Sequence, residues 1–242
     1  MRRADSAPLS APPALASTGA AERSALLKAM WFGIFQLLGL VSGWVGSYYF
    51  IGGALANIGA LNLGPTSSPS QVAAVLGPLF RSLSSIIPIV GVFQIVGVVA
   101  LLMAFRQLKR VDGRFSLPAT LEMVLLLGAL LAIAGAIPLF DALPNLISQI
   151  PVTPGSAIPP GLASTIASLI FYFILVAAGG LLAFVGLIGG QILGLWRIGS
   201  KYGETILELG AVFAIIPFLN MVAPVLVIVG ANQARNRLST AV

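Results

Sequence analysis

ASTIASLIFYFILVAAGGLLAFVGLIGGQILGLW, residues 163–196, is an uninterrupted stretch without a charged side chain. About 20 apolar residues in a helix are enough to cross a hydrocarbon core of about 30 Å. At about 1.5 Å per residue this stretch is longer than a bilayer is thick, so we expect it to tilt or to protrude. The stretch predicts a transmembrane helix, and similar apolar runs recur along the chain.

The composition of the whole chain is that of a protein whose solvent is lipid. Of its 242 residues, 58% are hydrophobic and 8% are charged, and the mean hydropathy is +1.02. Soluble domains carry about 25% charged residues, so this chain could not cover itself with a polar surface. The net charge of +6 comes from short basic clusters beside apolar runs. That placement is typical of membrane-orientation signals and argues against nucleic acid as a partner.

We expect an all-α fold, a polytopic transmembrane helix bundle of about five hydrophobic segments, the last broken by proline. The predicted parts are a disordered cytoplasmic N-terminal tail at 1–20, a transmembrane helical domain at 21–231 and a short polar C-terminal tail at 232–242. The predicted spans are residues 29–51, 86–105, 119–140, 163–196 and 205–231. Residues 52–71 are expected to form a loop, with or without a short interfacial helix. Residues 71–85 are expected to form an amphipathic helix, interrupted or bent near Pro78, that leads into the second span.

The fifth segment, residues 205–231, contains Pro217, Asn220 and Pro224 near its middle. Each proline removes a helical hydrogen bond, and a span tolerates this where neighbours or water satisfy the freed carbonyls. The segment is either one kinked span, which we favour, or a pair of half-helices that turn at residues 217–220. Its length supports a crossing, whereas the basic tail after it favours re-entry, so the side of the C-terminus stays open.

Lysine and arginine mark the cytoplasmic ends of transmembrane spans. They gather before the first predicted span, between the second and third, and after the fourth: Arg2, Arg3, Arg23, Lys28, Arg106, Lys109, Arg110, Arg114, Arg197 and Lys201. The two opposite connections hold only Arg81. We therefore expect a multi-pass protein of the cell (cytoplasmic) membrane with its N-terminus in the cytoplasm.

Small residues recur at four-residue spacing within the predicted spans. Such rows let helix backbones approach closely where lipid provides no hydrophobic drive for association. The candidate helix-packing residues are Gly39, Gly43, Gly128, Gly186, Gly190 and Gly194. We expect them at contacts between helices, within one chain or between chains.

Polar side chains inside the apolar runs are the candidates for function. They are the amides Gln36, Gln94, Gln191 and Asn220, the carboxylate Glu208, and the prolines Pro217 and Pro224. An amide in hydrocarbon needs a partner, so we expect these amides to face the bundle interior, as packing contacts or along a substrate pathway. We expect Lys201 to pair with Glu204, and Glu208 to reach the interface or Arg197. A coupling carboxylate at Glu208 is the alternative.

The residue types that carry most catalytic and metal chemistry are absent from this sequence, which has no Cys and no His. A zinc site would depend on carboxylates alone. The sequence also has no nucleophile elbow, no P-loop, no HExxH and no dinucleotide fingerprint. We expect no enzyme activity, no cofactor and no metal site.

The C-terminal third, LWRIGSKYGETILELGAVFAIIPFLNMVAPVLVIVGA at 195–231, resembles an archaeal membrane family known as domain of unknown function 973. The matching marks are Leu195-Trp196-Arg197-Ile198-Gly199, the pair Lys201-Tyr202, and Ile216-Pro217-Phe218-Leu219-Asn220 followed by Pro224. The first 160 residues match only in general layout. The resemblance implies an archaeal cytoplasmic membrane and a multi-span helical fold, and it makes the proline-broken segment a family trait. It brings no established activity.

The sequence thus predicts an integral membrane protein, and the favoured role is a non-enzymatic structural or accessory subunit that acts through helix–helix or lipid contacts. Dense small-residue packing and the absence of charges at span centres support that role. The alternative is a small transporter or channel that uses the Pro217–Pro224 helix break, because broken helices expose backbone groups that bind solutes. The expected partners are membrane lipids, and a second copy of the chain or another membrane protein.

Overall fold

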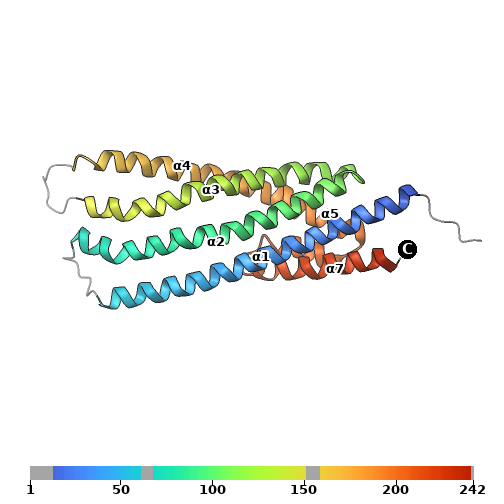
Figure 1. Cartoon of the computed structure of the whole chain (residues 1–242), viewed down its shortest axis with the longest axis horizontal. Helices are drawn as coiled ribbons and strands as arrows, with labels where there is room; N and C mark the ends of the chain where they lie inside the picture. The colour runs from blue at the N-terminus through green and yellow to red at the C-terminus, as the bar shows by residue number, and fades with distance from the viewer. Residues whose placement is uncertain (1–12, 61–67, 151–158, 241–242) are drawn as a thin grey trace, which may run out of the picture.

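The computed structural model describes residues 13–60, 68–150 and 159–240, and in these ranges the chain is helical and contains no strand. Long helices come first, and a pair of short helices joined by a turn completes the chain (Figure 1). The elements are α1 (Pro13–Ala60), α2 (Pro69–Lys109), η1 (Gly113–Phe115), α3 (Ser116–Gln149), α4 (Leu162–Gly186), the π-helical turn η2 (Leu187–Ile192), α5 (Leu193–Tyr202), α6 (Thr205–Phe213), η3 (Leu219–Met221) and α7 (Ala223–Thr240). The prediction of an all-α helix bundle is confirmed.

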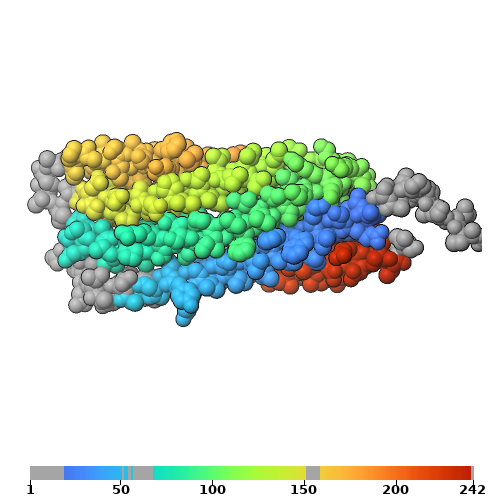
Figure 2. All heavy atoms as spheres, viewed as in Figure 1, coloured from blue at the N-terminus to red at the C-terminus, as the bar shows by residue number. Residues whose placement is uncertain are grey.

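The long helices lie side by side in chain order (Figure 1). α1 packs against α2, α2 against α3, and α3 against α4, whereas the described residues of α1 and α4 make no extensive contact. We call the end that holds Lys109, Arg110 and Lys201 the basic end, and the end where α1 leads to α2 and α3 leads to α4 the loop end. Figure 2 shows the row as continuous bands, with α7 beside α1 in the basic half only.

Four helical stretches are long and apolar enough to cross a membrane: Gly19–Phe50, Pro69–Lys109, Gly113–Gln149 and Leu162–Tyr202. In α2 the charge-free part between Arg81 and Arg106 is about 36 Å long at about 1.5 Å per residue. That length matches a hydrocarbon core of about 30 Å with a modest tilt. The chain therefore fits an integral membrane protein.

The first helix extends beyond the predicted span at both of its ends. Residues 13–20, predicted as part of a disordered tail, form its first turns, and residues 52–60, predicted as loop, continue it to Ala60. Residues 1–12 lie outside the described residues. The predicted boundaries were wrong because hydropathy locates the apolar part of a helix, whereas the backbone continues its hydrogen bonds until a breaking residue is reached.

The second helix begins with a capping box outside the predicted span. The Ser68 hydroxyl accepts a hydrogen bond from the Gln71 amide at 3.3 Å, and the Gln71 side chain accepts one from the Ser68 amide at 2.8 Å. This reciprocal pair satisfies two amides that have no partner within the helix. The amphipathic stretch at 71–85, predicted to lead into the second span, is thus the first part of α2, which continues through Pro78 and Pro88.

The fifth hydrophobic segment does not cross the bundle. α6 has 9 residues and is only about 13 Å long, after which the chain turns and α7 returns to the basic end (Figure 1). The favoured kinked span and the count of five were therefore wrong, and the predicted polar tail at 232–242 is helical as far as Thr240.

Local backbone chemistry explains this hairpin of α6, η3 and α7. Gly203, with a φ of 65°, adopts the left-handed conformation that ends α5 and turns the chain into α6. Pro217 cannot donate a backbone hydrogen bond, and Phe218 has a φ of 68°, so a helix cannot continue through them. Pro224 lies in the first turn of α7, where a missing amide proton leaves no bond unmade.

A row of glycines lets α3 and α4 meet backbone to backbone. A Cβ atom added at Gly179 would lie 2.7 Å from the carbonyl oxygen of Gly128, and one added at Gly128 would lie 2.7 Å from the carbonyl oxygen of Gly179. Gly186 lies equally close to Leu125. We call these glycines, together with Gly190, the glycine seam; sequence spacing indicated all of them except Gly179.

The remaining predicted packing glycines lie against α2. Gly194 faces the ring of Phe105, Gly39 faces Gln94, and Gly43 lies against Val90. All six glycines singled out from the sequence are thus at contacts between helices of the same chain.

The buried core fills only the basic half of the bundle. Fully buried side chains from α1, α2, α5, α6 and α7 meet there, among them Phe32, Leu101, Ile198 and Leu207. In the loop half, the row α1–α4 has no hairpin packed against it, since the described part of α7 contacts α1 near the basic end. A cavity lies at the boundary between the two halves.

Candidate functional site

A cavity of about 770 Å³ lies where the tip of the α6–α7 hairpin meets the row of long helices. α1, α2, α3, α4, η2 and the hairpin all contribute to its wall, which is mostly apolar. Phe32, Val98, Leu195 and Val227 belong both to the wall and to the buried core, so they close it towards the basic end. Phe184 and Asn220 line it but are exposed. The cavity is therefore open on one side.

Four side-chain amides converge on this cavity from four different elements. Gln36 comes from α1, Gln94 from α2, Gln191 from the π-helical turn η2, and Asn220 from η3. Within the described part of the chain, none of the four has a side-chain hydrogen bond. Among the described residues that line the cavity, none is charged. The amides predicted to face the bundle interior thus share one cavity, with free donors and acceptors.

The hairpin brings its two prolines to different places. Pro224 is buried and lines the cavity, and Pro217 is exposed at the tip. The neighbouring Phe218 is 84% exposed, and among the described residues it alone has a positive φ without being glycine. A sparsely populated backbone conformation of this kind costs a non-glycine residue about 1–3 kcal/mol. Strained backbone of this kind clusters at functional sites, which makes the turn at Phe218 part of the candidate site.

A buried carboxyl group lies behind the cavity wall and was missed by the sequence reasoning. Glu122 of α3 is 0% exposed, and neither of its carboxyl oxygens has a hydrogen-bond partner in the described structure. It lies against η2, where a Cβ atom added at Gly190 would be 2.8 Å from Oε2. π-Helical turns often mark functional sites, and this one also places Gln191 in the cavity. The available signal was the position of Glu122 inside the third predicted span.

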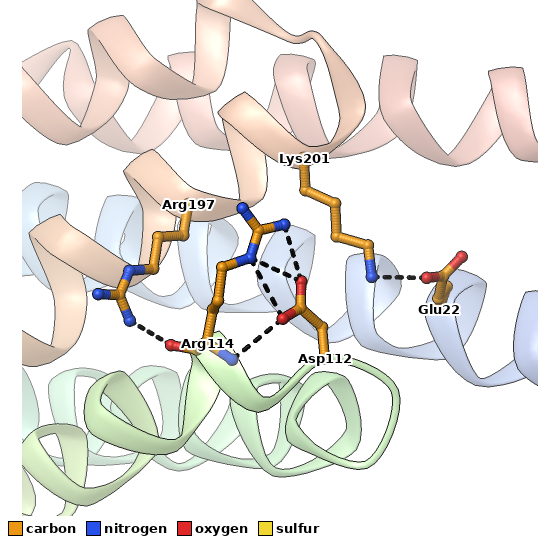
Figure 3. Close-up of polar contacts among 5 residues, drawn as sticks. All are labelled: Glu22, Asp112, Arg114, Arg197 and Lys201. Carbon is orange, nitrogen blue, oxygen red and sulfur yellow. Dashed lines mark hydrogen bonds and ion pairs between the residues drawn. The ribbon is translucent and has the colours of Figure 1, made fainter.

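The charged side chains at the basic end pair differently from the prediction (Figure 3). Lys201 forms an ion pair with Glu22 of α1 at 2.7 Å, and Glu204 pairs with Arg237 of α7 at 3.1 Å. The predicted Lys201–Glu204 pair is therefore absent, because Gly203 turns the chain between these residues and ends the helical spacing that the pair requires. Both observed pairs tie the chain ends to the bundle.

Arg197 and Asp112 stabilise the connection between α2 and α3. Arg197 donates a hydrogen bond to the backbone carbonyl of Arg114. A contact with Glu208, one of the two expectations for that carboxylate, is therefore not formed. The Arg114 side chain donates hydrogen bonds to both carboxyl oxygens of Asp112, and these bonds hold the pKa of Asp112 below its usual value. Glu208 packs against Gly199 and has no ion pair among the described residues, and it does not line the cavity.

The cavity offers binding chemistry and no evident catalytic set. In the described ranges no group of three His, Cys, Asp or Glu residues could hold a metal ion. Neutral amides on an apolar wall can hydrogen-bond an uncharged polar group and enclose an apolar body.

Comparison with known protein families finds a match over most of the chain. A family model described as a protein of unknown function (DUF973) matches residues 24–242. No curated protein and no solved structure matches the chain.

Proposed function

Because that match covers nearly the whole chain, the protein belongs to the DUF973 family, and from this premise we propose that it is a non-enzymatic membrane protein that binds an uncharged amphipathic molecule in its intramembrane cavity. The observation that carries the proposal is the convergence of Gln36, Gln94, Gln191 and Asn220 on one apolar cavity. The proposed role agrees with both expectations from the sequence, lipid contact and transport, because each begins with the binding of a molecule within the membrane.

The chemistry of the wall supports a neutral ligand. An ion or a zwitterion would need a charged partner to offset its desolvation, and none of the described residues that line the cavity is charged. A purely apolar ligand would leave four amides without partners, at a cost of roughly 1–3 kcal/mol for each one unsatisfied. A molecule with an apolar body and a hydroxyl, carbonyl or amide group satisfies both conditions. The volume lies within the roughly 300–1,000 Å³ of small-molecule sites.

The arrangement of the helices supports entry from the lipid. α7 packs on α1 and α6 on α5, so the hairpin fills the gap between α1 and α4 in the basic half alone. The cavity is open on one side, and the exposed Phe184 of α4 lines it. A lipid-like molecule enters there without crossing water, and its polar group meets the amides near the hairpin tip.

The charge distribution supports a cytoplasmic N-terminus in the cell membrane. Apart from Arg81, the Lys and Arg residues that the structure describes lie towards the basic end, including Arg235 and Arg237 in α7. The return of α7 removes the conflict that five crossings would create with the positive-inside rule. We place the basic end in the cytoplasm and the hairpin as a re-entrant element, in an archaeal membrane as the resemblance implies.

Lipid retention tests the proposal. The protein is extracted from its native membrane in mild detergent, and native mass spectrometry measures the bound molecules. We expect a neutral amphiphile at one copy per chain, reduced at least tenfold in the variant Gln36→Leu/Gln94→Leu/Gln191→Leu, because leucine keeps the bulk and removes the amides. Gln107→Leu is the matched control, since Gln107 is a half-buried amide of α2 that does not line the cavity. Equal retention by the triple variant and wild type would refute the proposal.

A second role, as an accessory subunit or homo-oligomer, is favoured by the aromatic side chains in the loop half of α1. Trp44, Tyr48 and Tyr49 are 60%, 78% and 74% exposed. A stoichiometric membrane partner, or a second copy of the chain, that is lost in Tyr48→Ala/Tyr49→Ala would support this role. A monomer in native-like lipid nanodiscs, with no partner in either form, would contradict it.

A further inference from the structure

A second, polar groove of about 430 Å³ lies between α3 and α4 near the loop end, away from the cavity. Asp141, Asn145 and Gln149 are four residues apart on α3, so they form a stripe on one face of that helix. Thr165, Ser168 and Tyr172 form a matching stripe on α4. The two stripes face each other because the glycine seam holds the helices together. A Cβ atom at Gly135 would lie 2.9 Å from the carbonyl oxygen of Tyr172.

The polarity of this groove differs from that of its surroundings. On the same helix ends, Ile150, Ile166, Ile170 and Phe171 are exposed apolar side chains. A helix end that simply projected into water would be polar on several faces, whereas here six polar side chains gather in one groove between apolar surfaces. The groove is thus a polar site at the edge of the apolar part of the bundle.

The groove carries one negative charge and otherwise neutral hydrogen-bonding groups. The Thr165 hydroxyl donates to the carbonyl of Gly161 at 3.1 Å, and the Ser168 hydroxyl donates to that of Ser164 at 3.0 Å. Their oxygen lone pairs stay available as acceptors, as does the Asp141 carboxylate, while Asn145 offers both a donor and an acceptor. The described residues that line the groove include no Lys or Arg. A phosphate group would meet a carboxylate and no cation there.

We propose that this groove binds a neutral, hydroxyl-rich group of the sugar class. Adjacent hydroxyls donate to a carboxylate such as Asp141 and accept from an amide such as Asn145, which matches the donors and acceptors of the groove. An ammonium group can only donate, so it would leave the amide donors unmatched. The same chemistry is offered by the sugar headgroup of a glycolipid and by a free sugar. This inference does not depend on the ligand of the intramembrane cavity.

The test uses the full chain in nanodiscs of phosphatidylglycerol, with and without a diglycosyl diacylglycerol, and measures retained lipid by native mass spectrometry. We expect preferential retention of the glycolipid, weakened at least tenfold by Asp141→Leu and by Asn145→Leu. Both residues are exposed, so these variants should fold. Ser148→Ala is the matched control, because Ser148 lies on the same helix and does not line the groove.

A second arm titrates maltose against protein in phosphatidylglycerol nanodiscs. Maltose binding that Asp141→Leu and Asn145→Leu weaken, without glycolipid preference, would support the proposal with a free sugar as the source. Glycolipid retention without maltose binding would support it with lipid as the source. Equal retention in wild type and both variants would overturn it. So would preference for a choline-headgroup lipid over the glycolipid, or the absence of binding in both arms.

Discussion

Adding one methyl group to the glycine seam should separate α3 from α4, and two adjacent glycines of α4 allow a matched test. A Cβ atom at Gly179 would lie 2.7 Å from the carbonyl oxygen of Gly128 and 2.9 Å from the Cα of Ala132, whereas one at Gly180 would meet nothing within 4 Å. Favourable contacts between carbon atoms lie at about 3.5–4.0 Å, so Gly179→Ala requires the helices to move apart by roughly 1 Å.

The expected magnitude follows from comparing the two variants. Both gain up to about 1 kcal/mol of helix propensity from glycine to alanine, and this contribution cancels in their difference. Overpacking typically costs about 1–3 kcal/mol, and the atoms met at Gly179 are backbone atoms that cannot rotate away. We therefore expect Gly179→Ala to be less stable than Gly180→Ala by about 1–3 kcal/mol, with the upper part of that range favoured.

This difference in stability is measured by thermal unfolding in detergent. Unfolding is monitored by the circular dichroism signal of the helices or by the amount of monomeric protein that remains after heating. For a chain of this size about 1 kcal/mol shifts the melting temperature by about 2–4 °C, so Gly180→Ala should melt several degrees above Gly179→Ala. Gly128→Ala should behave as Gly179→Ala does, because the two glycines face each other. Equal melting temperatures for the Gly179 and Gly180 variants would refute the backbone-to-backbone seam.

Four further predictions address the hairpin, the buried carboxyl group and the charges of the basic end. The chain has no cysteine, so Ser239→Cys carries a unique thiol; an impermeant thiol reagent should leave it unlabelled on intact cells, and labelling would contradict a re-entrant hairpin. Glu122 has no partner among the described residues, so Glu122→Gln should keep the melting temperature within a few degrees. Glu122→Ala should cost about 2–4 kcal/mol of stability because it leaves a cavity. Equal losses of stability in the two variants would contradict this and would point to a partner of the Glu122 charge. Lys201→Met should destabilise the protein by about 1–3 kcal/mol because it leaves Glu22 without its partner. A double variant that also carries Glu22→Gln should recover part of this loss. If the stability losses of the two single variants simply add in the double variant, the ion pair does not stabilise the fold. Hydrogen bonds from Arg114 lower the folded-state pKa of Asp112, so its contribution to stability is present above the unfolded-state pKa and is lost as the pH falls through the lower folded value; melting curves from pH 6 to pH 3 should fall less steeply for Asp112→Asn, and identical slopes would contradict this.

Much of the architecture could be predicted from the sequence because lipid imposes simple rules. A long uncharged run such as residues 163–196 has to be helical, since the hydrocarbon offers no partner for its backbone. The four-residue spacing of Gly186 and Gly190 places them on one helix face, and both lie against α3. The amides Gln36 and Gln94 reach the interior for the same reason, because the exterior cannot hydrogen-bond them.

Other features depended on contacts between distant parts of the chain. The length of residues 205–231 suits a crossing, and the return of α7 becomes evident only when it packs against α1. Lys201 has Glu204 close in sequence, yet its partner Glu22 lies on the first helix. Helical spacing cannot rank a local partner against one brought near by folding.

Two candidate functional sites also depend on contacts between distant parts of the chain. Glu122 appears in the sequence as an acid near the start of a span, and its burial results from the approach of the π-helical turn η2. The stripe of Asp141, Asn145 and Gln149 is visible in the sequence of α3, but the groove exists only because α4 places Tyr172 and its neighbours opposite. In both cases the pairing of α3 with α4 creates the site.

The central claim is that the cavity at the hairpin tip holds an uncharged amphipathic molecule, and a cryo-electron microscopy map of the chain in nanodiscs made with native lipids tests it most directly. We predict elongated non-protein density that enters between α1 and α4 and ends within hydrogen-bonding distance of Gln94 and Asn220. A cavity filled by side chains of a second chain, or closed by movement of the hairpin against α2, would contradict the claim.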